Sequence, residues 1–441
     1  MFSCFSKTTL IFLLLVSTTH AFANNECKIV LSSGTQQSAA VRNLVQKDAY
    51  KQWLLWEQKA NLHNYEKPTT TINISLVKVS EEDLHVIKTE DAPENLVNLF
   101  KANGGDILWA KHPYNTNPRV PFKDFPEETS LPVYMTSSRS LALDGTLRGF
   151  TIKLATDYPH GPNGEYQPSK VDTNDDVDSA LIHSTHVKTV DGAFGSDPKL
   201  IILGEVMTIS SRVSGIGMVV RDVRATDDGN YYLPAFSIPY VGREIAKISR
   251  VPFEEFFGEH YATLLGEAKA RLLLRYGLQM FSPNPQNMLI QLNRNLKPTG
   301  KLVFRDISDA YLVDVVAKGL GYNKQIERDV AIKYPPQKVI RPDWSNSSWR
   351  FDEAGDKSVD SATIQQWGQL HDQAYVNYIN KNLGLNISVD TRGAPQDFLN
   401  TVYQALASDI GQVKLAQFRQ RLETRELERQ QTTPSNSAAS F

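Results

Sequence analysis

The segment between Pro252 and Gly277 constrains the fold of this chain more than any other. Its apolar side chains recur at the spacing of about 3.6 residues that places them on one face of an α-helix. Two short strands are expected after it, over 288–292 and 302–305, joined by a polar turn. The predicted helix carries one apolar stripe made of Phe253, Phe256, Phe257, Tyr261, Leu264, Leu265, Ala268 and Leu272.

The composition places the 441-residue chain among ordinary folded proteins, with 41% hydrophobic, 22% charged and 10% aromatic residues. These values exclude collagen-like, coiled-coil and mostly disordered chains. A formal net charge of −2 gives no electrostatic basis for binding nucleic acid or an anionic membrane surface. At roughly 100–200 residues per domain, the length predicts two domains or one large domain with lobes.

The N-terminus has the three parts of a secretory signal peptide. Lys7 precedes the apolar stretch 10–16, and Ala21-Phe22-Ala23 fits a cleavage site. Residues 1–23 are therefore predicted to be removed on export to the periplasm or the outside of the cell. Cleavage leaves Cys27 as the one thiol, so no internal disulfide is expected. The apolar stretch is too short to span a bilayer, and no later segment is long enough.

Strand-like segments dominate the first part of the chain and helical ones the second, which predicts an α+β fold with two lobes. A long loop or hairpin tip is expected over 156–178, because this stretch is rich in Gly, Pro and Asp. The further strands are expected at 70–79, 106–110, 149–155, 199–206 and 217–223, and the further helices at 36–62, 94–101 and 408–431. The expected divisions are a signal peptide (1–23), an N-terminal α+β region (24–130), a strand-rich nucleotide-binding lobe (131–250), a helix-rich lobe (251–431) and a disordered tail (432–441).

Two candidate metal motifs are weak. Asp172, Asn174, Asp176 and Asp178 begin like a calcium loop, but the glycine and the terminal glutamate are missing, so a solvated acidic turn is expected. The histidines at 183 and 186 have no zincin-type carboxylate nearby and are expected on the surface.

The expected hairpin after the long helix carries a more specific pair. Asn287 precedes its first strand and Asp306 follows its second, so the two side chains are expected at paired strand ends. An Asn and an Asp placed in this way can hold Mg²⁺ on a triphosphate, as in kinases. Lys153, within an upstream strand, can reach phosphate oxygens, and Arg139 is suited to anions. The alternative is a polar hairpin in which this pair arises by chance.

The order of several short motifs resembles that of the IucA/IucC family, the aerobactin-type NRPS-independent siderophore synthetases. The family shows H-P-W-Q, T/S-S-x-R-T, a K-L strand, a G-hydrophobic-R-E strand, a helix ending in Y-G, then H-G-Q-N and R-D. The resemblance covers about 107–311. The corresponding residues here are His112-Pro113-Tyr114-Asn115, Thr136-Ser137-Ser138-Arg139, Lys153-Leu154, Gly217 to Asp222, Tyr276-Gly277, Asn284-Pro285-Gln286-Asn287 and Arg305-Asp306.

The resemblance implies a palm, fingers and thumb fold with a kinase-like nucleotide pocket that takes ATP and Mg²⁺. The reaction it implies activates a small-molecule carboxylate as an acyl-adenylate, which an amine or alcohol then attacks. The implied roles are catalysis for Lys153, Arg139, Gln286 and Asn284; nucleotide binding for His112, Ser137, Ser138, Arg139, Lys153, Asn287 and Arg305; and magnesium binding for Asn287 and Asp306.

Two departures from the family pattern bear on the substrate. The family's H-G-Q-N histidine, which contacts the carboxylate substrate, is replaced by Asn284. The family's T-S-x-x-R segment, which grips citrate, is replaced by the stretch 156–162, which has no arginine. Because a polycarboxylate then lacks a bidentate partner, citrate is not the expected substrate.

Two alternatives to the ligase stay open, and the first is favoured by export, which conflicts with a reaction that consumes ATP. One is an exported binding protein that kept the fold without the activity. The other is a kinase-like phosphotransferase, although the position of the kinase base, five residues before the metal Asn, is Ser282. The helix expected at 408–431 can pack on the body of the chain or on a second subunit, as in a homodimer.

Overall fold

The computed structural model describes residues 39–60, 71–102, 104–113, 122, 124–136, 139–154, 174–214, 216–280, 285–307, 310–322, 358–391 and 395–432. The chain divides into two compact units, 1–45 and 46–441. Within the first unit the described element is α3 (Ala39–Leu44). All elements discussed below belong to the second unit.

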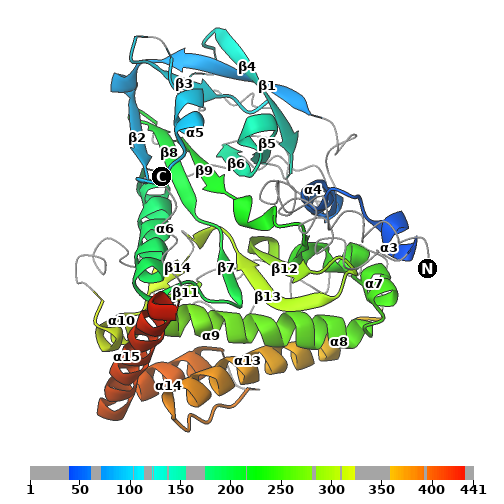
Figure 1. Cartoon of the computed structure of the whole chain (residues 1–441), viewed down its shortest axis with the longest axis vertical. Helices are drawn as coiled ribbons and strands as arrows, with labels where there is room; N and C mark the ends of the chain where they lie inside the picture. The colour runs from blue at the N-terminus through cyan, green and yellow to red at the C-terminus, as the bar shows by residue number, and fades with distance from the viewer. Residues whose placement is uncertain are drawn as a thin grey trace, which may run out of the picture. The chain divides into compact units, whose positions relative to one another are not determined.

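Three sheets contain the described strands (Figure 1). The largest has eight strands, all paired antiparallel, in the order β2 (Leu84–Lys88), β8 (Glu205–Ser211), β9 (Gly217–Asp222), β6 (Phe150–Leu154), β5 (Ser140–Leu143), β4 (Glu127–Met135), β1 (Ile72–Val79) and β3 (Ile107–Ala110). The second has the order β10 (Tyr231–Pro234), β12 (Met288–Leu292), β13 (Pro298–Phe304) and β7 (Leu200–Ile202). The third pairs β11 (Leu278–Met280) with β14 (Ala310–Leu312).

The helices of the second unit gather mainly toward the C-terminus, as expected. They are α4 (Ala49–Ala60), α5 (Glu94–Leu99), α6 (Asn174–Phe194), α7 (Ile238–Ser249), α8 (Phe253–Phe257), α9 (Leu264–Tyr276), α10 (Asp314–Leu320), α13 (Ser361–Leu383), α14 (Pro395–Ala407) and α15 (Asp409–Thr432). Short helical turns are η1 (Glu81–Asp83), η2 (Gly145–Leu147), η3 (Arg224–Thr226), η4 (Ala235–Ser237) and η6 (Pro285–Asn287). Among the described residues, no helix is both long enough and apolar enough to cross a bilayer.

The long helix predicted after Pro252 is present, with a π-helical segment, η5 (Gly258–Thr263), between α8 and α9. Figure 1 shows these three elements as one continuous rod with α13 alongside. The rod ends at Tyr276, where Gly277 adopts a left-handed backbone (φ 69°) and donates its N–H to the Leu273 carbonyl at 2.9 Å. The helix therefore begins and ends where the sequence predicts.

Several sequence predictions need correction, among them the strand expected over 199–206, which is divided into β7 and β8. The helix expected over 36–62 is broken, because Asp48 caps a new helix by accepting bonds from the N–H groups of Tyr50 and Lys51. The loop expected over 156–178 gives way to α6 from Asn174 onward. The histidines expected on the surface, His183 and His186, are buried, because α6 packs against β8 of the large sheet.

The two largest hydrophobic cores among the described residues support these layers. One face of the large sheet forms the first core, which is covered by Leu96 of α5 and by Phe100, the residue after this helix. The second core joins α9, α10, α13, α14 and α15. The division expected at residue 130 falls inside β4, and β1 pairs with β4 in the same sheet.

The second core has a point of backbone contact between α9 and α13. A Cβ atom at Gly266 would lie 2.0 Å from the carbonyl oxygen of His371. Replacing Gly266 by Ala is therefore expected to lower the free energy of unfolding by about 3 kcal/mol, because the helices must separate. Gly192→Ala on α6, with no atom within 4 Å of the added Cβ, is the control and should be neutral or stabilising. Chemical denaturation of both variants measures the difference, and equal stability would contradict this packing.

A buried lysine in the same layer makes stability depend on pH. Lys269 on α9 is completely buried, and burial lowers its pKa to about 7, although the charge of Asp372 acts in the opposite direction. In the unfolded chain the amine keeps its proton up to its ordinary pKa of 10.5. Between these values the unfolded state binds more protons, so stability rises with pH.

Lys269→Met is therefore expected to raise the unfolding temperature more at pH 6.5 than at pH 9.5. The cost of burying the charged amine is complete below pH 7 and fades toward pH 10.5. Thermal unfolding at both pH values measures the effect. Lys188→Met, at a lysine whose side chain is 38% exposed, is the control. An equal change at both pH values would refute a role for ionisation of Lys269.

Candidate functional site

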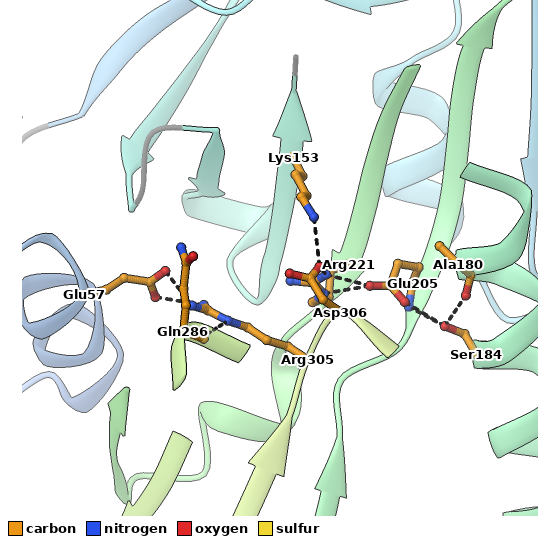
Figure 2. A network of polar contacts seen from close by, with 9 residues as sticks. All are labelled: Glu57, Lys153, Ala180, Ser184, Glu205, Arg221, Gln286, Arg305 and Asp306. Carbon is orange, nitrogen blue, oxygen red and sulfur yellow. Dashed lines mark hydrogen bonds and ion pairs between the residues drawn. The ribbon is translucent and has the colours of Figure 1, made fainter. Parts of the chain in front are cut away.

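Two cations from neighbouring strands converge on one carboxylate. Lys153 Nζ lies 3.2 Å from Oδ1 of Asp306, and the guanidinium of Arg221 donates to the same oxygen. Figure 2 shows both side chains directed at Asp306 from different strands. Of these residues, sequence reasoning singled out Lys153 and Asp306, and the structure brings them together.

Strand register determines which side chains share this side of the large sheet. On β6, Lys153 pairs with Val219 of β9, and Thr151 pairs with Arg221. Directly paired residues point to the same face, so the lysine and the arginine lie on one side. Ile152, between them in sequence, points into the apolar core on the other side. Lys153 and Arg221 thus lie on the face of the large sheet opposite the apolar core that contains Ile152.

A short connection brings Asp306 to this face. The chain passes from β7 to β8 through Leu203 and Gly204. The Leu203 N–H donates to the Phe304 carbonyl at the end of β13, and the Gly204 carbonyl accepts from the Asp222 N–H at the end of β9. These two bonds fix the end of β13 beside the end of β9. Asp306 and Arg221 meet for this reason.

Glu205 fixes Arg221 on its other side. Glu205 is paired with Arg221 across β8 and β9, and its Oε1 accepts from Nε at 2.9 Å and Nη2 at 2.7 Å. Ser184 of α6 accepts the Glu205 N–H at 2.8 Å, and its Oγ lies 2.9 Å from Oε2. The side chains of Arg221 and Glu205 are 7% and 1% exposed. The guanidinium is therefore a fixed, buried cation.

The backbone of Asp306 is left-handed, with φ of 56°. Aspartate tolerates this conformation better than most residues, and such positions recur at functional sites. Burial by itself would raise the pKa of Asp306, but the positive charges of Arg221 and Lys153 outweigh it and hold that pKa well below its ordinary value. The carboxylate is therefore ionised at any ordinary pH.

A second ion pair lies next to the first. Arg305 makes a bidentate pair with Glu57 of α4, at 2.9 Å for both bonds, and its Nε donates to the Gln286 carbonyl at 2.9 Å. Its backbone N–H donates to the Asn287 carbonyl at 3.0 Å. The predicted hairpin is thus confirmed, with Asn287 beside Arg305 and Asp306 at the paired strand ends. Because the guanidinium of Arg305 is already bonded to Glu57, a nucleotide could contact it only if this ion pair broke.

The structure gives less information on the other residues predicted for the site. Arg139 lies beside the site, because its carbonyl accepts the Leu154 N–H at 2.9 Å and the next residue, Ser140, pairs with Lys153. His112 is buried after β3, and the order of the sheet places β5, β4 and β1 between β3 and β6. Its predicted place near phosphates stays a prediction. Ser137, Ser138, Ser282, Asn284 and the stretch 156–162 lie outside the described residues.

The residues present fit a magnesium ion that arrives with phosphates. In the part of the chain that the structure describes, no three His, Cys, Asp or Glu side chains gather as a metal cluster. Mg²⁺ commonly takes one or two carboxylates and completes its shell with water and substrate phosphates, which Asp306 and Asn287 could satisfy. Two cations beside Asp306 would repel a metal ion that arrived alone.

Sequence reasoning missed the residues that hold this site in place. Arg221 belongs to the strand motif from Gly217 to Asp222, but no role was predicted for it. It follows three apolar strand residues, and a charge buried within a strand needs a buried partner of opposite charge. That partner, Glu205, follows Gly204, and its support, Ser184, lies on α6, which the sequence did not predict. Glu57 lies 248 residues before Arg305 in the sequence, so no local pattern could connect them.

The chain is similar in structure to solved NRPS-independent siderophore synthetases, at low sequence identity. No family model matches it, and no curated protein matches it. The aerobactin synthetase IucC of Klebsiella pneumoniae has 12% identity and a TM-score of 0.49 over 85% of this chain and 80% of that one. ATP-bound aerobactin synthetase IucA of the same organism has 12% identity and a TM-score of 0.48 over 76% and 65%.

The petrobactin biosynthesis protein AsbB of Bacillus anthracis has 11% identity and a TM-score of 0.49 over 83% of this chain and 71% of that one. At these values the likeness assigns no activity, which has to come from the side chains of the site.

The Glu57–Arg305 pair is expected to matter for stability. Glu57→Gln removes one charge from a pair whose side chains are 1% and 7% exposed, which leaves a buried guanidinium without its counter-ion. The free energy of unfolding should fall by about 3 kcal/mol. Asp227→Asn, in a partly exposed pair with Arg148, is the control and should cost about 1 kcal/mol or less. Equal losses in both variants, measured by denaturant unfolding, would show that burial of the pair is unimportant.

Proposed function

We propose that the chain binds ATP with Mg²⁺ and uses it to adenylate a small-molecule carboxylate, which it joins to an amine or an alcohol. The observation that supports this most is the convergence of Lys153 and Arg221 on Asp306, beside Asn287 at the paired strand ends. Fixed cations beside a carboxylate and an amide provide what a magnesium-bound polyphosphate requires. The order of motifs from His112 to Asp306 points to the same chemistry.

The proposed reaction has two steps. A carboxylate oxygen of the substrate attacks the α-phosphorus of ATP, and pyrophosphate leaves. An amine or hydroxyl then attacks the acyl carbon, and AMP leaves as the new amide or ester forms. Lys153, Arg221 and Arg139 would balance the charge that develops on the phosphates, and bound Mg²⁺ would supply further neutralisation. The reaction needs positioning and charge stabilisation rather than a protein nucleophile.

The proposal also covers which carboxylate is used and where the protein acts. Asn284 replaces the histidine that contacts the carboxylate substrate in the family, and the stretch 156–162 lacks the arginine of the segment that grips citrate, so we propose a carboxylate other than citrate. Residues 131–250 would form the nucleotide-binding lobe and 251–431 the helix-rich lobe. Residues 1–23 would direct export, and the ATP would then come from the compartment that the protein reaches.

One observation favours a second candidate, an exported binding protein without catalysis. The site's charged groups already have internal partners: Lys153 and Arg221 share Asp306, and Arg305 has Glu57. A site whose charges are balanced internally has less electrostatic attraction for a ligand. A kinase-like phosphotransferase would instead produce ADP.

Thermal unfolding with Mg²⁺ and ATP tests nucleotide binding. A ligand at a hundredfold excess over its dissociation constant adds about 2.7 kcal/mol, which is a shift of a few degrees in a protein of this size. Lys153→Ala should lose the shift, and Lys188→Ala on the exposed side of α6 should retain it. In Asp306→Ala, the unfolding temperature should be the same in ATP with Mg²⁺ as in ATP with EDTA.

Product analysis then separates the candidates. AMP and pyrophosphate, formed in the presence of a carboxylate and an amine, support the ligase, whereas ADP supports the phosphotransferase. No thermal shift at millimolar ATP would exclude both enzymes and leave the binding protein.

A further inference from the structure

We infer that Lys153 and Arg221 form an anion site that Asp306 occupies in the absence of ligand, and that a phosphate takes these cations when Asp306 leaves them. Asp306 is therefore an internal stand-in for the ligand as well as a candidate metal ligand. The existence of the anion site follows from the geometry of the three side chains. Its assignment to the phosphates of a nucleotide rests on the proposed function.

The first support is that both cations bind the same oxygen. Lys153 Nζ lies 3.2 Å from Oδ1 of Asp306, and Arg221 Nη2 donates to that atom. Phosphate oxygens accept the same charge-assisted bonds from lysine and arginine as carboxylate oxygens do. The position of Oδ1 thus marks where a ligand oxygen would lie.

The second support is that the site persists when Asp306 moves. Arg221 is held from behind by Glu205, through bonds of 2.7 and 2.9 Å, and Glu205 is held by Ser184. Both Arg221 and Glu205 are almost completely buried. Because these contacts do not involve Asp306, the guanidinium remains in place when the carboxylate departs.

The third support is that Asp306 lies on the accessible side of the group. The side chains of Lys153 and Asp306 are 24% and 16% exposed, against 7% for Arg221. Asp306 also lies two residues after the end of β13, outside the strand ladder. Lys153 and Asp306, the more accessible side chains, therefore cover the buried arginine, and a small displacement of Asp306 would open the site to solvent.

Charge counting connects this displacement to a metal ion. The two cations and the two carboxylates of Asp306 and Glu205 sum to zero, so an anion gains little by approaching. Removing or neutralising Asp306 leaves a net charge of about +1 within a few ångströms of the site. A magnesium ion that draws Asp306 away would thus release both cations. Polyphosphate and metal would bind cooperatively, each favouring the other equally.

Titration calorimetry with inorganic pyrophosphate in EDTA tests the inference on the full chain. Asp306→Asn keeps the shape of the side chain, tolerates the left-handed backbone and removes the charge. We expect it to bind pyrophosphate at least about tenfold more tightly than the unmodified protein, because one nearby negative charge is gone. Asp306→Gly, which also accepts this backbone, should change binding in the same direction and guards against misfolding of a single variant.

Two controls restrict the interpretation. Adding Lys153→Met to Asp306→Asn should abolish the gain, because one of the two cations is lost. Asp197→Asn removes a carboxylate from another buried arginine pair, with Arg271 at 3.0 Å, and should leave pyrophosphate binding unchanged. A gain in Asp197→Asn would show that general charge, rather than this site, attracts the anion, and would overturn the inference.

The outcomes distinguish the inference from the proposed function. Equal metal-free binding of pyrophosphate to folded Asp306→Asn and to the unmodified protein overturns the inference, even if Mg²⁺-ATP binds. Tighter binding to the variant, with no binding of Mg²⁺-ATP to the unmodified protein, supports the anion site and contradicts the nucleotide. If Asp306→Asn binds pyrophosphate more tightly and the unmodified protein binds Mg²⁺-ATP, both the inference and the proposed function are supported.

Discussion

The buried pair of Arg221 with Glu205 is the interaction on which the site depends. An arginine inside a sheet is costly unless every part of its charge is matched, and here one carboxylate lies behind it and another in front. The first belongs to the neighbouring strand of the large sheet, and the second follows the last strand of the hairpin. One guanidinium thereby joins two sheets at the point where their polar side chains meet.

The backbone makes this meeting geometrically possible. The Leu203–Gly204 connection bonds to Phe304 on one side and to Asp222 on the other. These backbone hydrogen bonds alone therefore fix the distance between β13 and β9. α4 adds a second constraint, because Glu57 binds Arg305 and the neighbouring Gln58 contacts the Met135 carbonyl at the end of β4. Helix, hairpin and sheet are thus held around the same few residues.

Local patterns predicted those features whose causes are local. Two short apolar runs joined by a polar turn identified the hairpin of β12 and β13, so the pairing of Asn287 with the Arg305–Asp306 end was correct. The apolar stripe after Pro252 predicted the helical rod, and Gly277 ends it. α6 was not predicted, since its buried positions include Ser184, His183 and His186, which do not form an apolar stripe.

The sequence by itself determined the α+β class, the helical rod, the hairpin and the presence of a lysine, an asparagine and an aspartate suited to a phosphate site. Periodicity of 2 or 3.6 residues is a property of neighbouring positions and needs no tertiary contact. Only the tertiary structure decided that Asp306 faces Lys153 and Arg221, and that Arg305 faces Glu57. These pairs are 153, 85 and 248 residues apart along the chain, and the low dielectric of the interior acts only once folding has brought them together.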